Sequence, residues 1–290
     1  DSALMYVLSL NKFTKGGIEF YNSSLFGSVK DDSISSFLNL TDKDGVDQFG
    51  LGLYTAIDAN DNIHLKMARG LKLNYEDWAV NPLNRVVLGA QNKGFFIDAL
   101  QLSSGNQSIS VQSKDTALNS PFSLAIKNFT IANITRMLSK DTILADGILN
   151  VDGELDLRGD FAKINADARI DSLQVLGAGL GNLSLNAFNE SADAYQAKLN
   201  LVGSGNDLGI SGHYYTKAQN GNDLDFNADI KSFALKSIEG ITFGAIRNSS
   251  GTLWGNLKIN GSLTNPLIDG TLNTQELQTT LSSFNTFLRM

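Results

Sequence analysis

Apolar and polar residues alternate strictly along many short stretches of the chain. From Val151 to Phe161 the odd positions are apolar or Gly and the even positions are charged or polar. From Leu253 to Leu263 the pattern recurs, with Trp254 as the one apolar residue at an even position. This alternation is typical of an antiparallel strand with one buried and one solvated face. Similar stretches follow one another about every ten residues, which predicts an all-β meander.

Two stretches predict short helices instead, at residues 131–140 and 235–244. They belong to an internal repeat, because "IKNFTIANI" at Ile126–Ile134 recurs as "IKSFALKSI" at Ile230–Ile238. Gly-bounded alternating strands follow each copy. We therefore predict three segments: an N-terminal segment over residues 1–121, a first repeat unit over 122–225, and a second, truncated unit over 226–290.

The composition narrows the class of protein. The chain has 290 residues, of which 42% are hydrophobic and 18% are charged, so it is a folding chain. Its net charge of −7 and its lack of long basic runs argue against nucleic acid as a partner. It contains no cysteine, which excludes disulfides and thiol chemistry. No apolar stretch is long enough to be a membrane-spanning helix and no signal peptide is visible, so we expect a portion of a longer protein.

Candidate catalytic chemistry is sparse. The two histidines, His64 and His213, have no partner at the spacing of a metal site or a catalytic triad. Acidic pairs such as Asp42 and Asp44 fall in turns, where solvated carboxylates are common. We expect no catalytic residue, no metal and no cofactor, and we predict that the protein is not an enzyme.

One-sided strands without a catalyst must cover their apolar face. A closed β-sandwich would do so, and so would an open, curled sheet whose apolar side lines a groove. Glycines at inward positions favour strong curvature, because they relieve crowding on the concave side. The candidate curvature glycines are Gly153, Gly159, Gly255 and Gly261. A groove with almost no charge would suit acyl chains.

The stretch "GTLWGNLKINGSLTNPLIDGTLN" resembles the Gly- and Asn-Pro-containing signature of the TamB family, with Asn265-Pro266 followed by Gly270. The unit from Phe122 onward is also similar to that family's repeats, although "FAKINAD" replaces the Asn-Pro element in the first copy. The family belongs with the AsmA-like and bridge-like lipid-transfer proteins. The similarity covers Phe122–Leu281.

The resemblance implies an elongated β-taco, which is a curled antiparallel sheet with an apolar inner groove and one or two short helices. It also implies a location in the periplasm of a diderm bacterium, with the parent protein anchored in the inner membrane. The implied partners are phospholipids and an outer-membrane barrel of the BamA/TamA type.

A closed β-sandwich would indicate an adhesin or another surface protein, with the same apolar residues as ordinary core. Two functions are consistent with an open sheet. The first is a bridge that carries phospholipid acyl chains between the inner and outer membranes. Its lining would be Leu155, Leu157, Phe161, Ile170, Leu185, Leu199, Leu201, Ile210, Phe226, Ile230, Leu257, Ile259 and Leu263. The alternative is a scaffold that assists outer-membrane protein assembly by strand augmentation.

Overall fold

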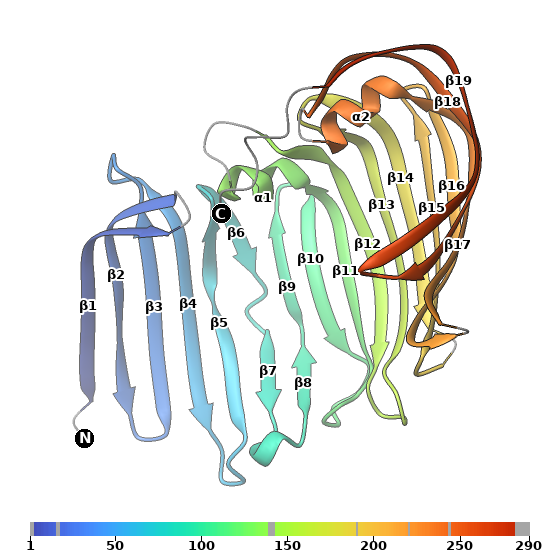
Figure 1. Cartoon of the computed structure of the whole chain (residues 1–290). Helices are drawn as coiled ribbons and strands as arrows, with labels where there is room; N and C mark the ends of the chain where they lie inside the picture. Colours follow the sequence, from blue (N-terminus) through green and yellow to red (C-terminus); the bar gives the residue numbers. More distant parts are fainter. Residues whose placement is uncertain are drawn as a thin grey trace. The chain divides into compact units, whose positions relative to one another are not determined.

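The chain forms an antiparallel sheet of nineteen strands with two short α-helices. The computed structural model describes residues 3–15, 18–138, 143–189, 191–219, 221–242 and 245–281. Within these residues β1 is paired with β2 alone and β19 with β18 alone, so the sheet does not close on itself. Figure 1 labels the strands and helices. The predicted fold class, an all-β curled antiparallel sheet, is confirmed, and the alternative of a β-sandwich is wrong.

Two compact units divide the chain. Unit 1 comprises Asp1–Phe129, Met137–Lys140 and Asp152–Ala162, and unit 2 comprises Thr130–Arg136, Asp141–Val151 and Lys163–Met290. These units are defined by the contacts within each of them. The predicted segments at 1–121, 122–225 and 226–290 are defined by the sequence repeat instead. The segment boundaries therefore stay a prediction.

Unit 1 is built from short and medium strands joined by tight turns. The strands are β1 (Leu4–Lys15), β2 (Ile18–Lys30), β3 (Ser33–Thr41), β4 (Asp47–Ile57), β5 (Ile63–Leu73), β6 (Glu76–Val80), β7 (Arg85–Leu88), β8 (Phe95–Asp98), β9 (Leu100–Ser104) and β10 (Gln107–Ser113), with a 3₁₀ turn at Ala90–Asn92. Strands β1 to β5 pair in chain order. Both β6 and β7 then pair with β5, at different points along it, so together they form one interrupted strand.

Three elements include the points at which the units divide: β11 (Phe122–Thr130), α1 (Ile131–Leu138) and β12 (Ala145–Asp156). The predicted helix over 131–140 begins as expected, and its last two residues lie outside the described residues. The strand predicted to continue to Phe161 ends earlier, at Asp156. The Asp156 carboxylate accepts a hydrogen bond from the backbone N–H of Arg158 at 3.0 Å, which turns the chain.

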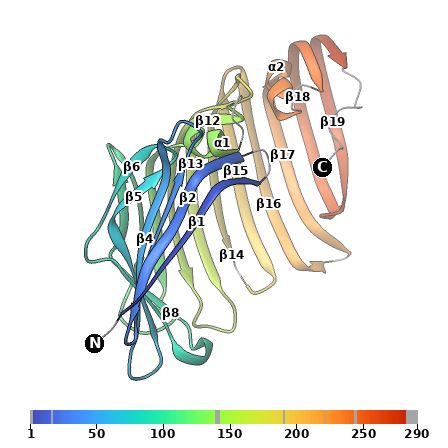
Figure 2. The ribbon, with the colours of Figure 1, turned by 90° about the vertical axis from the view of Figure 1, so that its left-hand side faces the viewer.

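Unit 2 has longer strands in a regular meander, and Figure 2 shows them side by side. Its elements are β13 (Lys163–Val175), β14 (Ala178–Asn189), β15 (Ala194–Gly203), β16 (Asn206–Gln219), β17 (Asn222–Ala234), α2 (Leu235–Ile241), β18 (Ile246–Ser262) and β19 (Asn265–Leu281). Each strand pairs with the next. The predicted helix over 235–244 corresponds to α2, which ends at Ile241, and residues 243–244 lie outside the described residues. The strand–helix–strand order β17–α2–β18 repeats that of β11–α1–β12.

A small core lies at the end of unit 2 where α2 packs. Leu173, Leu180 and Leu201 are buried together. Ser172 has a positive φ of 54°, and the β13–β14 register shifts on both sides of Leu173. Such a bulge re-aims side chains, and here it brings Leu173 into the same cluster as Leu201.

Candidate functional site: the apolar surface of unit 2

The strand register of unit 2 aligns apolar residues into continuous rows across seven strands. Residues directly opposite each other in an antiparallel pair lie on the same face of the sheet. Three successive rows contain only apolar side chains and Gly. They are Ala166–Ala187–Ala197–Gly212–Phe226–Ile259–Ile268, Ala168–Leu185–Leu199–Ile210–Ala228–Leu257–Gly270 and Ile170–Leu183–Leu201–Leu208–Ile230–Gly255–Leu272. We call these residues the apolar surface.

The apolar surface is neither fully buried nor fully exposed. Leu201 lies in the core cluster and is 5% exposed, whereas Leu185 in the neighbouring row is 37% exposed. The seven strands, spaced about 4.8 Å apart, give the surface a width of about 29 Å. Because no charged or hydrogen-bonding side chain interrupts it, this surface can bind hydrocarbon but cannot perform acid–base or metal chemistry.

Most of the predicted lining residues meet on this surface. Nine of them lie in the three rows: Ile170, Leu185, Leu199, Leu201, Ile210, Phe226, Ile230, Leu257 and Ile259. Leu263 follows the end of β18 and lies in the turn before β19, where it is exposed. Leu155, in β12, and Leu157 and Phe161, which follow that strand, belong to unit 1.

Sequence reasoning missed several residues of the apolar surface. Leu183 and Leu208 share its alternation and could have been found from "GNLSLNAF" and "NDLGISG". The alanines carry too weak a hydrophobic signal to stand out. In unit 1 a comparable row went unassigned, and it runs Leu8–Leu25–Leu38–Leu51–Leu71–Trp78.

The predicted curvature glycines occupy different environments. At Gly255, with φ of 149°, an added Cβ would lie 1.9 Å from the Thr271 carbonyl oxygen. Gly261 has φ of 85°, and there an added Cβ would lie 2.7 Å from the Asn265 carbonyl oxygen. Gly159 follows β12 with ordinary φ, and an added Cβ there would lie 3.6 Å from the Phe161 carbonyl oxygen, an ordinary contact distance. Gly153 lies within β12. Close strand approach therefore requires Gly at 255 and 261, whereas no such crowding exists at Gly159.

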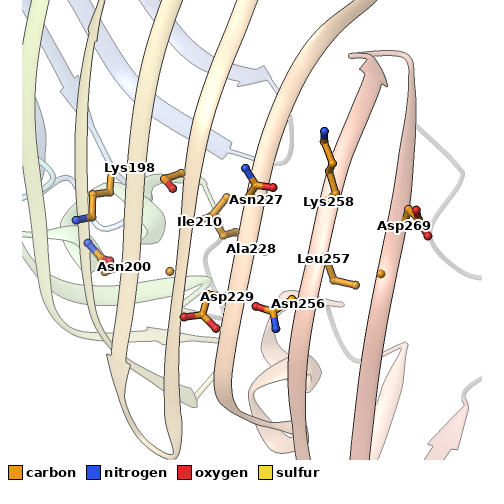
Figure 3. A pocket seen from close by; sticks show the side chains of 13 residues that line it. Lys198, Asn200, Ile210, Asn227, Ala228, Asp229, Asn256, Leu257, Lys258 and Asp269 are labelled. Atoms are coloured by element: carbon orange, nitrogen blue, oxygen red, sulfur yellow. The ribbon is translucent and has the colours of Figure 1, made fainter.

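The opposite face of unit 2 is mostly polar, with Phe188, Val202, Trp254 and Leu267 as apolar exceptions. Two rows on this face contain only polar, charged or Gly residues: Asp167–Asn186–Lys198–Ser211–Asn227–Lys258–Asp269 and Arg169–Ser184–Asn200–Gly209–Asp229–Asn256–Thr271. An open hollow of about 410 Å³ lies over β15 to β19. Its lining combines lysine, aspartate and asparagine side chains with Ile210, Ala228 and Leu257, as Figure 3 shows. Lysines and aspartates alternate across it, so the hollow has no single charge sign. This is the face that water covers.

One hydrogen-bonded group of titratable and polar side chains lies in a surface turn of unit 1. His64 Nε2 lies 2.9 Å from Asp58 Oδ2. The pKa of Asp58 is held well below its usual range, most strongly by that hydrogen bond and next by the hydrogen bonds from Asn62. Asp58 also accepts a hydrogen bond from the backbone N–H of Asn60, which is the pattern of an Asx turn.

In unit 2, the His213 ring stacks on Tyr215 at 5.8 Å between centroids. Among the described residues, no three His, Asp or Glu side chains come close enough together to hold a metal ion.

Neither helix in the described part of the chain has the length and hydropathy needed to cross a bilayer. Comparisons of the chain with protein-family models, with curated proteins and with solved structures find no match.

Proposed function

We propose that the apolar surface binds the acyl chains of phospholipids and lets them pass along the sheet, without catalysis. The observation that carries this proposal is the set of three rows in which every residue is apolar or Gly across seven strands. Each methylene group moved from water onto such a surface contributes about 0.8 kcal/mol. A contiguous, partly exposed apolar area of this extent marks a binding surface.

The composition of the surface favours mobile hydrocarbon over a fixed protein partner. Protein interfaces carry about one hydrogen bond per 100–200 Å² and a polar rim that sets their register. The three rows offer no donor or acceptor side chain with which a partner could be fixed in place. A surface without such groups holds an acyl chain equally well at each strand, which is the property that a conduit needs.

The proposed setting follows the resemblance to the TamB family. In that setting the protein carries phospholipid between the inner and outer membranes of a diderm bacterium, in the periplasm. An outer-membrane barrel of the BamA/TamA type would receive the lipid, and the parent protein would be anchored in the inner membrane.

Lipid extraction with native mass spectrometry tests the proposal on protein expressed in a diderm host. We expect co-purified phospholipid on the wild-type chain and its loss from the Leu199→Asp and Leu257→Asp variants. Asn200→Asp, next to Leu199 but on the polar face, is the matched control and should retain lipid. Circular dichroism confirms that each variant is folded. Wild-type protein without lipid, or equal lipid on the Leu199→Asp variant, contradicts the proposal.

A second candidate function, the assembly scaffold, rests on the edge strand β1. Its residues from Leu4 to Asn11 contain no charge and no proline, the features that usually protect an edge. Leu4, Met5 and Val7 are 69%, 79% and 74% exposed. If the protein is a scaffold that adds strands at this edge, Val7→Pro should abolish binding of the partner strand and Leu199→Asp should not. If it is a conduit, Leu199→Asp should abolish lipid binding and Val7→Pro should not.

A further inference from the structure

The apolar surface has two chemically different ends. At one end, α2 and the Leu173–Leu180–Leu201 cluster cover it. The buried Asn206 amide donates to the Leu180 carbonyl oxygen at 2.7 Å and to the Ser237 hydroxyl of α2 at 2.8 Å. The Asn206 side-chain oxygen accepts the Ala234 backbone N–H at 2.9 Å, where β17 leads into the helix. These bonds fix α2 at this end, which is therefore closed.

The opposite end carries a pair of tyrosines. Tyr195 and Tyr214 face each other in the β15–β16 register, one row beyond Ala197 and Gly212, and on the same face as the apolar surface. Their rings lie 6.1 Å apart. Along β15, the side chains on this face are therefore the buried Leu201, then Leu199 and Ala197, and finally the phenol of Tyr195.

The hydroxyl groups of this pair are free for a ligand. Within the described part of the chain, neither phenol oxygen has a hydrogen-bond partner. The phenols of Tyr6, Tyr21 and Tyr75 in unit 1, in contrast, each donate to a backbone or carboxylate oxygen. An aromatic ring with a polar tip is the side chain that prefers a boundary between hydrocarbon and polar groups.

The length of the apolar path matches a lipid tail. Tyr195 and Leu201 are six residues apart on one strand, which corresponds to about 20 Å. One leaflet of a bilayer has a hydrocarbon thickness of about 15 Å, half of the usual core. An acyl chain laid along β15 from the tyrosine pair would therefore reach the cluster under α2.

We propose that Tyr195 and Tyr214 fix the orientation of the bound lipid. This inference rests on the proposed function and adds to it a direction. The acyl chains lie parallel to the strands, with their methyl ends at the Leu201 cluster. The ester groups lie at the tyrosine pair, where the phenols donate hydrogen bonds to them. The headgroup projects beyond the strand ends that lie opposite α2, so that headgroups of different size can be carried.

Paramagnetic relaxation in the unmodified protein tests the orientation. Phosphatidylcholine carrying a nitroxide near the ester should broaden the amide signals of Tyr195 and Tyr214. The same lipid with its nitroxide near the methyl end should broaden those of Leu201 and Leu208. A reversed or uniform pattern overturns the orientation while leaving lipid binding intact. No broadening on any row of the apolar surface overturns the proposed function itself.

Removal of the hydroxyl groups tests the role of the phenols. We expect Tyr195→Phe and Tyr214→Phe each to weaken phosphatidylcholine binding by about two- to tenfold, the effect of one lost hydrogen bond. Tyr215→Phe is the matched control, because Tyr215 lies next to Tyr214 but on the opposite face, and it should bind as the wild type does. Equal affinity of all three variants and the wild type overturns the hydrogen-bonding role.

Discussion

Asn84 fills a gap in the sheet of unit 1 with its side chain. Met67, in the middle of β5, is paired with β4 on one side, but neither β6 nor β7 pairs with it on the other side. The Asn84 side-chain oxygen accepts the Met67 backbone N–H at 2.7 Å, and its amide nitrogen donates to the Met67 carbonyl oxygen at 3.0 Å. The side chain is 2% exposed. One primary amide thus replaces a peptide group in the ladder.

We expect Asn84→Ala to lower the free energy of unfolding of unit 1 by about 2–4 kcal/mol, because it leaves a donor and an acceptor of Met67 unpaired. Urea denaturation followed by circular dichroism measures the change. Asn60→Ala is the control, since Asn60 is exposed and only its backbone N–H is hydrogen-bonded. Its unfolding free energy should stay within about 0.5 kcal/mol of the wild type. Equal effects of the two substitutions would refute the role of Asn84.

The interruption at Asn84 could not be predicted from the sequence, although the neighbouring strands could. Alternation at Ile63–Met67 and Leu71–Tyr75 indicates where β5 lies, because period two is visible in any single strand. The sequence "NPLN" that follows β6 reads as an ordinary turn. That its last residue, Asn84, folds back onto Met67 depends on pairing between distant residues, which local patterns do not encode.

At the scale of the strand, glycine allows close approach of neighbouring backbones in unit 2. Gly255 in β18 lies against Thr271 of β19, and the space for a Cβ is filled by the Thr271 carbonyl oxygen. Gly209 in β16 has ordinary φ, and an added Cβ would meet its nearest neighbour, the Asn200 side-chain oxygen, at 3.4 Å. Two glycines in the same sheet therefore differ in whether a side chain fits.

We expect Gly255→Ala to destabilise unit 2 by more than about 1 kcal/mol, because the residue must combine a positive φ with a backbone clash. Gly209→Ala should be neutral or should stabilise by about 0.4–1 kcal/mol, through the reduced entropy of the unfolded chain. Thermal and urea unfolding of the two variants give the comparison. The explanation is wrong if both substitutions shift stability equally.

Across the chain, the sequence predicts the faces of unit 2 better than those of unit 1. In unit 2 most residues of one parity are polar over long strands, so the polar face can be recognised from the alternation. In unit 1 both faces of the first strands carry large apolar residues. Phe26 stacks on Phe37 at 5.4 Å, and Phe37 meets Tyr54 edge-on at 5.8 Å, on the face opposite Leu25 and Leu38. Alternation alone cannot show which of two apolar faces is the inner one, which explains why no lining residue was predicted in these first strands.

Three of the predicted lining residues that lie outside the apolar surface share one cause. Leu157, Phe161 and Leu263 continue the alternation past the last paired residue of their strands, because turns at Asp156 and Ser262 intervene. Alternation shows which side a residue would face, and only hydrogen bonding shows where the strand ends. The register then adds the small residues, such as Ala187 and Ala197, that make three complete rows.

The central claim is that hydrocarbon lies on one face of unit 2 and water on the other. Photo-crosslinking from adjacent positions tests it most directly. The photoreactive residue p-benzoylphenylalanine replaces Leu199 or Leu257 on the apolar surface, and Lys198 or Lys258 on the polar face. The account predicts phospholipid adducts, identified by mass spectrometry, from positions 199 and 257 and none from 198 and 258. Adducts from both faces alike, or from the lysine positions alone, would contradict it.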